Sequence, residues 1–343
     1  MKSVAIVTNS LSGGGAERAM NLLAHNLGKY EELSVLLIPI NAGPRDLVQP
    51  NCDISEIKRV WNGGIWDTVK AFVRFQIAIL RFKPRFLILN CDLPEFFSAL
   101  AIWNAKCIIV EHTTRPWAGR KSFGSVIRWI LYIRGASYLR VSERIKSSHQ
   151  FNESRVIPNI IDPKIIASQV KQNDVPDSQG KLVFVGRLSK EKRPDLFIEL
   201  ARKTKFESLI IGDGLLGLAL RQGSKEVGNL RFLGQQLNPW EFASARDLLV
   251  LTSEYEGDGL VALEAISLGI PVALRSTSDL QRIGFPLRNY FEDIPTLAAR
   301  IAKNDFSDFE LSDSERSQIL KDRNPEEVLR LWLQFLLSIE RPA

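Results

Sequence analysis

The sequence is poor in the side chains that build metal centres and disulfide frameworks. Its 343 residues include three histidines and three cysteines, and Cys52, Cys91 and Cys107 form no C-x-x-C pair. An odd number of widely spaced cysteines argues against both a disulfide framework and a zinc cluster. We therefore expect no structural metal and no bound cofactor.

Long apolar runs are also missing. The longest fall far below the roughly 20 residues that cross a bilayer. The start, "MKSVAIVTNSLSGGGAER", has a lone lysine and only a short apolar run before a glycine turn, which is unlike a signal peptide. We expect a cytoplasmic protein.

Positive charge is present but unevenly distributed. Residues 1–165 hold 22 Lys and Arg against 13 Asp and Glu, whereas the remaining residues are slightly acidic. Residues 115–146 alone carry eight basic residues and one acid, interleaved with Trp, Phe and Tyr. We expect an anionic partner at this segment. Nucleic acid is not predicted, because no recognisable reader motif accompanies the charge.

Short apolar runs alternate with helical patterns along most of the chain, as in βαβ units with parallel sheets. The runs lie at residues 4–8, 33–40, 85–90, 107–112, 182–187, 208–214 and 247–253. The polar, proline-containing stretch 162–181 interrupts the pattern and is the predicted linker. We predict an α/β protein with an N-terminal domain at 1–163, a C-terminal domain at 164–324 and a terminal helix at 325–343 that packs on the N-terminal domain.

Two segments present groups that suit an anion. In "VAIVTNSLSGGGAER", a glycine turn at Gly13–Gly15 links a strand to a helix, where backbone N–H groups can receive a phosphate. In "LVFVGRLSKEKRP", Arg187 follows a strand end and Lys192 can join it from the turn, which suits a diphosphate. The alternatives are a plain tight turn and a solvated charged turn.

Acids gather in "SEYEGDGLVALEAISLGIP", residues 253–271. Glu256 lies in a loop after a strand, and Glu264 lies inside the helix predicted from Leu260 to Leu268. The two carboxylates can accept hydrogen bonds from sugar hydroxyls on either side of a phosphate at the helix N-terminus. A metal site made with Glu254 and Asp258, a hydrolytic carboxylate pair, and solvated loop acids remain alternatives.

Together the segments "SGGGAER", "VGRLSKEKRPDLFIEL", "IIGDG", "LRFLG" and "SEYEGDGLVALEAISLGIPV" resemble the retaining glycosyltransferases of family 4, which have the GT-B fold of two Rossmann-like domains. The resemblance spans essentially the whole chain and is strongest from Lys181 to Ala273. Three features depart from the usual pattern: Asp258 stands where many relatives have an aromatic residue, Ile160 stands where glycine is common, and the sequence after Ala273 lacks the usual glycines. Asp258 is therefore where we expect this chain's own donor preference.

The resemblance implies roles for individual residues. Arg187 and Lys192 would hold the diphosphate of a nucleotide-sugar donor, Glu256 would contact hydroxyls of the transferred sugar, and Glu264 would bind the ribose. His112, in "VEHTT", resembles the active-site histidine of the family. Further donor positions are Gly14, Gly15, Gly186, Gly257, Asp258, Gly259 and Leu260.

The resemblance also implies a reaction that needs no metal and retains the anomeric configuration. For the acceptor we expect a lipid-linked saccharide, such as a polyprenyl diphosphate saccharide, used at the anionic inner membrane surface during cell-surface polysaccharide synthesis. The predicted contacts are Arg115, Arg120, Lys121 and Arg128. A soluble acceptor, a sugar-nucleotide epimerase of the same fold, and a non-catalytic binding subunit remain alternatives.

Overall fold

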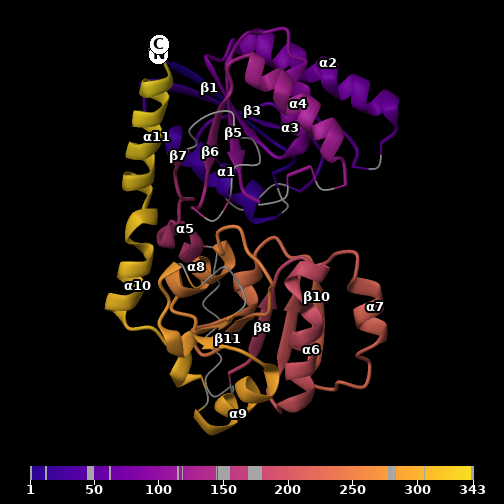
Figure 1. Cartoon of the computed structure of the whole chain (residues 1–343), viewed down its shortest axis with the longest axis vertical. Helices are drawn as coiled ribbons and strands as arrows, with labels where there is room; N and C mark the ends of the chain where they lie inside the picture. The colour runs from indigo at the N-terminus through magenta and orange to yellow at the C-terminus, as the bar shows by residue number, and fades with distance from the viewer. Residues whose placement is uncertain are drawn as a thin grey trace. The chain divides into compact units, whose positions relative to one another are not determined.

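The computed structural model describes residues 2–340 except 12–13, 45–49, 62, 114–115, 118, 144, 146–154, 169–179, 277–280, 282 and 305. The chain divides into two compact units, and each is described by itself (Figure 1). Unit 1 comprises residues 1–160 and 325–343, and unit 2 comprises residues 161–324. The boundary after residue 160 lies three residues before the predicted one.

Unit 1 is built on a seven-stranded sheet in which every strand pair is parallel. The strand order is β3 (Asp53–Ile54), β2 (Leu33–Pro39), β1 (Lys2–Thr8), β4 (Phe86–Asn90), β5 (Lys106–Glu111), β6 (Ser137–Arg140) and β7 (Arg155–Val156). The central strands β1, β4 and β5 are apolar and largely buried, as is typical of parallel strands covered on both faces.

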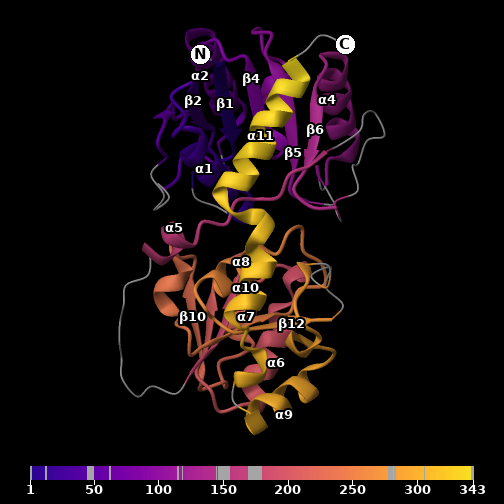
Figure 2. The same ribbon diagram turned by 90° about the vertical axis from the view of Figure 1, so that its left-hand side faces the viewer.

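Helices cover both faces of this sheet. One face carries α2 (Ile65–Phe82), α3 (Asp92–Ala99) and α4 (Lys121–Ile133), whose apolar residues share one core with β1, β2, β4 and β5. The other helices of the unit are α1 (Gly15–Leu27) and α11 (Pro325–Glu340), and these two are in contact. Figure 2 shows α11 lying along unit 1.

The last turn of α11 is tied to the start of the chain. The Glu340 carboxylate lies 2.6 Å from Lys2 Nζ and 2.7 Å from an Arg85 guanidinium nitrogen. Along its length the helix buries Trp332 and Phe335, whose rings are 6.3 Å apart. These contacts confirm that the C-terminal helix packs on the N-terminal domain.

Unit 2 is built on a six-stranded parallel sheet. The strand order is β10 (Leu230–Gly234), β9 (Ser208–Ile211), β8 (Leu182–Val185), β11 (Leu248–Leu251), β12 (Val272–Arg275) and β13 (Tyr290–Phe291). Its helices are α5 (Pro163–Ser168), α6 (Pro194–Lys203), α7 (Gly217–Gln222), α8 (Leu260–Ser267), α9 (Ile294–Asn304) and α10 (Asp313–Leu320). Two apolar cores lie on the two faces of the sheet. The predicted α/β architecture of two parallel-sheet domains is confirmed.

Some predicted details were incomplete. The sequence pattern missed the short strands β3, β6, β7, β10, β12 and β13, and helix α5 occupies the first part of the predicted linker. Most of the remaining linker lies outside the described residues. Within the described ranges no helix is long and apolar enough to cross a membrane.

Candidate functional site

The candidate donor residues of unit 2 lie where β8 and β11 end. These strands are neighbours in the sheet, so the turns that follow them meet at one edge. Gly186 and Arg187 follow β8, and a short 3-10 turn, η1 (Lys190–Lys192), carries Lys192. Arg187 is exposed, and among the described residues its guanidinium makes no ion pair or hydrogen bond, so it can accept an anion.

The ends of β8 and β9 approach each other closely at their glycines. Gly212 has φ +142°, and a Cβ built there would lie 1.9 Å from the carbonyl oxygen of Gly186. A larger residue would push the two strand ends apart and displace Arg187. The glycine in "IIGDG" is therefore a packing requirement of this edge.

Lys192 and Glu256 face each other across the two turns. Lys192 Nζ lies 2.5 Å from both carboxylate oxygens of Glu256, and Ser253 Oγ donates to Glu256 Oε1 at 2.7 Å. The side chains are 25% and 11% exposed, so each charge is only partly solvated. The structure thus brings together the cation and the carboxylate that the sequence assigned to the donor diphosphate and the donor sugar.

The turn after β8 and the loop after β11 are fastened together by hydrogen bonds. Thr252 Oγ1 donates to the carbonyl oxygens of Lys192 and Arg193, both at 2.8 Å. The backbone N–H of Glu254 donates to the Glu191 carbonyl at 2.9 Å, and Arg193 lies 3.1 Å from the Glu254 carboxylate. These hydrogen bonds and this ion pair fix the backbone positions from which Lys192 and Glu256 project.

The three acids of the loop do not converge on one point. Glu254 pairs with Arg193, Glu256 with Lys192, and Asp258 with Arg323. In the part of the chain that the structure describes, no group of three or more His, Cys, Asp or Glu side chains is arranged to hold a metal ion. The three loop carboxylates therefore form three separate ion pairs with basic residues.

Asp258 is anchored by a residue that is distant in sequence. Both guanidinium nitrogens of Arg323 donate to its carboxylate at 2.7 Å, and the Asp258 side chain is 4% exposed. A bidentate pair of this kind fixes geometry as well as charge. We therefore reassign the Asp258 carboxylate from donor preference to holding the loop in place.

Helix α8 begins directly after this loop, as predicted. Gly259 adopts φ +68° at the position before the helix, a conformation that favours glycine, and Leu260 is the first helical residue. Gly269, with φ +75°, follows the helix at its predicted end. The first N–H groups of an α-helix have no partner within the helix, so the N-terminus of α8 offers donors for an anion beside Gly257.

Glu264 lies one turn into α8 and is largely buried. Its Oε2 accepts a hydrogen bond from the indole nitrogen of Trp240 at 2.8 Å, and Trp240 itself is fully buried. The indole fixes one carboxylate oxygen of Glu264 and so orients the second. No motif in the sequence singles out Trp240.

In unit 1 the glycine turn precedes α1, and one of its backbone donors is held by an acid of that helix. The backbone N–H of Gly14 donates to Glu17 Oε2 at 3.0 Å, an arrangement in which the acid caps its own helix. Gly15 is the first residue of α1 and is exposed. Gly13 lies outside the described residues.

His112 follows the last residue of β5. Its Nε2 is buried and makes no hydrogen bond to any described residue. Burial lowers the pKa of His112 from 6.5 to about 4, because a charged imidazolium would be desolvated there. The side chain is therefore neutral at physiological pH, and its Nε2 is a polar atom that a bound molecule could engage.

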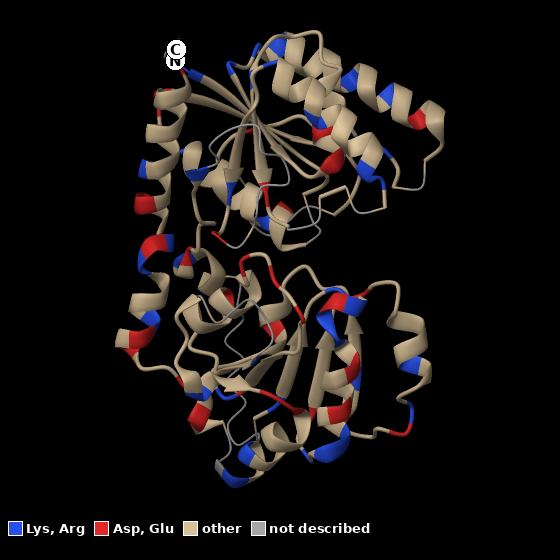
Figure 3. Ribbon diagram, in the orientation of Figure 1, with Lys and Arg blue, Asp and Glu red and all other residues tan. Residues whose placement is uncertain are grey.

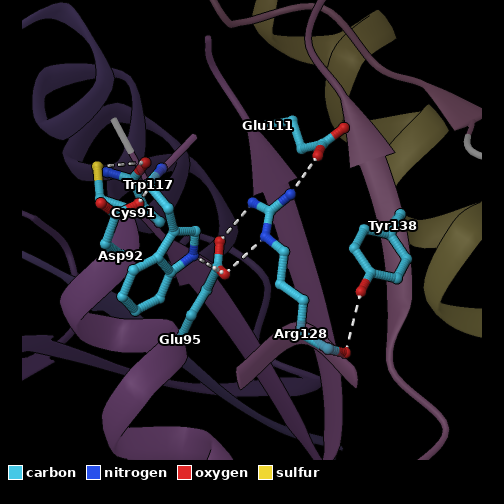
Figure 4. Close-up of polar contacts among 8 residues, drawn as sticks. Cys91, Asp92, Glu95, Glu111, Trp117, Arg128 and Tyr138 are labelled. Carbon is cyan, nitrogen blue, oxygen red and sulfur yellow. Dashed lines mark hydrogen bonds and ion pairs between the residues drawn. The ribbon is translucent and has the colours of Figure 1, made fainter. Parts of the chain in front are cut away.

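Glu111, the residue before His112, belongs to a buried cluster that ties β5 to α3 and α4 (Figure 4). Arg128 on α4 donates to both oxygens of Glu95 on α3, at 2.7 and 2.8 Å, and to Glu111 Oε1 on β5 at 2.7 Å. All three side chains are at most 2% exposed. Trp117, in the loop after His112, donates its indole N–H to Glu95 Oε2 at 2.8 Å.

The predicted role of Arg128 as a membrane contact is therefore wrong, because its guanidinium is enclosed by two carboxylates. Two other basic residues of the segment are also structural: Arg134 donates to the Ala101 carbonyl at 2.8 Å, and Arg140 donates to the Ile145 carbonyl at 3.1 Å. Arg120 and Lys121 are exposed, and Arg115 lies outside the described residues.

Comparison with known proteins agrees with this geometry. Residues 166–281 match the family model described as "Glycosyl transferases group 1". The O-antigen biosynthesis glycosyltransferase WbnH of Escherichia coli is 31% identical over 180 residues, which is 49% of this chain and 51% of that protein. The chain thus aligns with about half the length of this curated relative.

Longer alignments are more distant. The GalNAc-alpha-(1->4)-GalNAc-alpha-(1->3)-diNAcBac-PP-undecaprenol alpha-1,4-N-acetyl-D-galactosaminyltransferase of Campylobacter jejuni is 25% identical over 297 residues, covering 78% of this chain and 77% of the relative. Anabaena HepE, solved in complex with UDP and glucose, superposes with a TM-score of 0.78 at 17% identity over 98% of this chain and 100% of that one. Residues 166–281 thus match the group 1 glycosyltransferase family model, and the chain as a whole has the GT-B fold.

Proposed function

We propose that the protein is a retaining glycosyltransferase that moves a sugar from a nucleoside diphosphate sugar to a hydroxyl of a membrane-associated acceptor. The observation that carries the proposal is the edge of unit 2 where exposed Arg187 and the Lys192–Glu256 pair project from adjoining turns. Two cations, a carboxylate and a helix N-terminus at one sheet edge match the charges of a diphosphate joined to a sugar.

In this proposal the ion pair between Lys192 and Glu256 is exchanged when the donor binds. Lys192 turns to the diphosphate, and Glu256 accepts hydrogen bonds from sugar hydroxyls. Each of the two charged side chains thus exchanges its ion-pair partner for a group of the donor. Arg187 and the N-terminus of α8 hold the rest of the diphosphate charge. Glu264, oriented by Trp240, accepts from the ribose hydroxyls.

Breaking the bond between sugar and phosphate leaves negative charge on the diphosphate. Cations fixed before the reaction stabilise that charge without reorganising, and such preorganised groups are commonly the largest contribution to catalysis. The acceptor hydroxyl attacks from the face that the diphosphate leaves, and the departing phosphate takes its proton. The scheme retains the anomeric configuration and calls on no protein base and no metal.

For the donor nucleotide we propose UDP, because HepE was solved with UDP and glucose. For the acceptor we propose a polyprenyl-diphosphate-linked saccharide used in cell-surface glycan synthesis. The names of two relatives support this choice, because one includes a saccharide on PP-undecaprenol and the other includes O-antigen biosynthesis.

The proposal is tested by screening UDP and GDP sugars for thermal stabilisation and then for turnover with membrane lipid extract. Arg187→Met should weaken UDP binding about 10- to 100-fold, because a charge-assisted hydrogen bond contributes roughly 1.5–3 kcal/mol. The matched control is Arg202→Met, since Arg202 is another exposed arginine of unit 2 and pairs with Glu226. Equal losses in both variants, or no stabilisation by any nucleotide sugar, would refute the donor site.

Two alternatives keep the same donor site. A transferase with a soluble acceptor would turn over with free saccharides and ignore the lipid extract. A sugar-nucleotide epimerase would change the donor without any acceptor, which NMR of the nucleotide sugar would reveal.

A further inference from the structure

Exposed large hydrophobic side chains are concentrated on one stretch of unit 1. Among the described residues, fourteen of the twenty such side chains lie between Val60 and Ile133. Single exposed hydrophobic residues are ordinary, whereas a contiguous group marks an interaction surface. Most of this group lies on helices α2 and α4.

Helix α2 has two apolar faces. One face buries Ala71, Phe75 and Ile79 against the sheet. The opposite face repeats at intervals of three and four residues and is exposed, with Trp66 at 76%. Its apolar members are Ile65, Trp66, Val69, Val73, Ile77 and Leu80.

Helix α4 follows the same plan in the same layer. It buries Ile127 and Leu131 in the core that α2 also shares, and it exposes Val126, Trp129 and Ile133 on its other side. Because both helices pack on one face of the sheet, both exposed stripes point away from it. Figure 1 shows α2, α3 and α4 gathered on this side of unit 1.

Helix α3 lies between the two and joins them through aromatic contacts. The rings of Phe72 on α2 and Phe97 on α3 are 5.5 Å apart, as are those of Phe96 on α3 and Phe123 on α4. The three helices therefore form one continuous layer, and the stripes of α2 and α4 belong to one surface.

The charges beside these stripes are positive. Lys70 and Arg81 are exposed on α2, and Lys121 is exposed at the start of α4, whose sequence contains no acid. Figure 3 marks the basic residues of the unit 1 helices in blue. The one acid of α2, Asp67, accepts a hydrogen bond from the backbone N–H of Val60 at 2.8 Å. The surface thus combines apolar residues with flanking cations.

We propose that the outer faces of α2 and α4 dock on an anionic phospholipid bilayer, with Trp66 and Trp129 at the level of the headgroups. Tryptophan favours this interface, because its ring is apolar and its N–H can be hydrated. A helix that lies in the interface buries its apolar face, while lysine and arginine attract anionic headgroups. This inference rests on the proposed function, because docking on a bilayer would bring the enzyme to its lipid-linked acceptor.

The charge of the surface favours lipid over a second copy of the chain. Two copies that met through this surface would bring their lysines and arginines together, and like charges placed opposite each other oppose association. Anionic headgroups neutralise the same side chains.

The test is sedimentation of the full-length protein with vesicles of phosphatidylcholine alone or mixed with phosphatidylglycerol. We expect binding to the mixed vesicles that weakens in high salt. The double variant Trp66→Ser/Trp129→Ser should bind about tenfold or more weakly, because two large apolar side chains no longer leave water. The matched control is Leu215→Ser/Leu218→Ser, since both leucines are highly exposed in unit 2.

Three results would overturn the inference. The first is that the protein stays in the supernatant with the mixed vesicles. The second is that both double variants lose vesicle binding equally. The third is that the tryptophan variant changes only self-association, as measured by sedimentation velocity. Thermal stabilisation by nucleotide sugars tests the donor site independently of vesicle binding. If nucleotide sugars stabilise the protein but vesicles do not bind it, the proposed docking surface is refuted and the donor site stands. If vesicles bind the protein but no nucleotide sugar stabilises it, the donor site is refuted and the docking surface stands.

Discussion

Replacing Glu256 by glutamine tests whether the ion pair with Lys192 is exchanged on donor binding. The Glu256 carboxylate holds Lys192 Nζ at 2.5 Å from both oxygens. A diphosphate must compete with this carboxylate for the lysine. Glutamine keeps the shape of the side chain but removes the charge, so Lys192 becomes easier to recruit.

The size of the effect follows from the partial burial of the pair. Fully exposed ion pairs contribute about 0–1 kcal/mol, and hydrogen bonds to charged groups contribute about 1.5–3 kcal/mol. With side chains 25% and 11% exposed, the Lys192–Glu256 pair lies between these cases, at about 1–2 kcal/mol. We therefore expect Glu256→Gln to bind UDP about 5- to 30-fold more tightly.

Turnover should move in the opposite direction, because the sugar loses a charged hydrogen-bond acceptor. We expect the rate of sugar transfer to fall about 10-fold or more in Glu256→Gln. The assays are calorimetry with UDP and transfer kinetics with the nucleotide sugar. The matched control is Glu254→Gln, since Glu254 lies in the same loop and pairs with Arg193. Unchanged or weaker UDP binding in Glu256→Gln would refute the exchange.

Three further predictions concern the supports of the site. Arg128→Met should lower the free energy of unfolding of unit 1 by about 3–5 kcal/mol, measured by hydrogen exchange, because two buried carboxylates lose their cation; Arg120→Met, at an exposed arginine, should change it little. His112 has a pKa of about 4 in the fold and 6.5 otherwise, so protonation favours the unfolded chain as the pH falls below 6.5. Through His112, the free energy of unfolding of unit 1 should fall by about 2 kcal/mol between pH 7 and pH 5. Urea unfolding at several pH values should show that His112→Gln removes this part of the pH dependence. Arg323→Met should weaken UDP binding by freeing the loop at Asp258. The double variant Asp258→Asn/Arg323→Met should lose no more UDP affinity than Arg323→Met alone, and additive losses would contradict the coupling between Asp258 and Arg323.

The fold was predictable because its signals are local. Buried parallel strands such as β1 and β8 read as short apolar runs, and α8 is bounded by glycines that take left-handed conformations. The missed strands are short and several lie at sheet edges, as β3, β7 and β13 do. Two-residue strands carry too few residues to show a pattern.

The site was predictable only in part. Lys192 and Glu256 could be anticipated because each follows a strand of one parallel sheet, and such strand ends share an edge. The partners Arg323 and Trp240 could not, since they meet the loop and α8 through tertiary packing and have no motif of their own.

Arg128 shows the converse error. Sequence charge alone predicted a surface residue, but Glu95 and Glu111, 33 and 17 residues away along the chain, enclose it. The apolar stripe of α2 was missed for a related reason. An exposed hydrophobic face and a buried one look alike in sequence until the sheet shows which side is covered.

We propose that unit 2 binds a nucleotide sugar whose sugar is transferred with retained configuration. The most direct measurement is incubation of the protein with UDP-sugars and membrane lipid extract, followed by NMR of the glycosylated lipid. We expect a new glycosidic bond with the anomeric configuration of the donor, and we expect Arg187→Met but not Arg202→Met to lose this product. A product of inverted configuration, or a donor altered without any transfer, would contradict it.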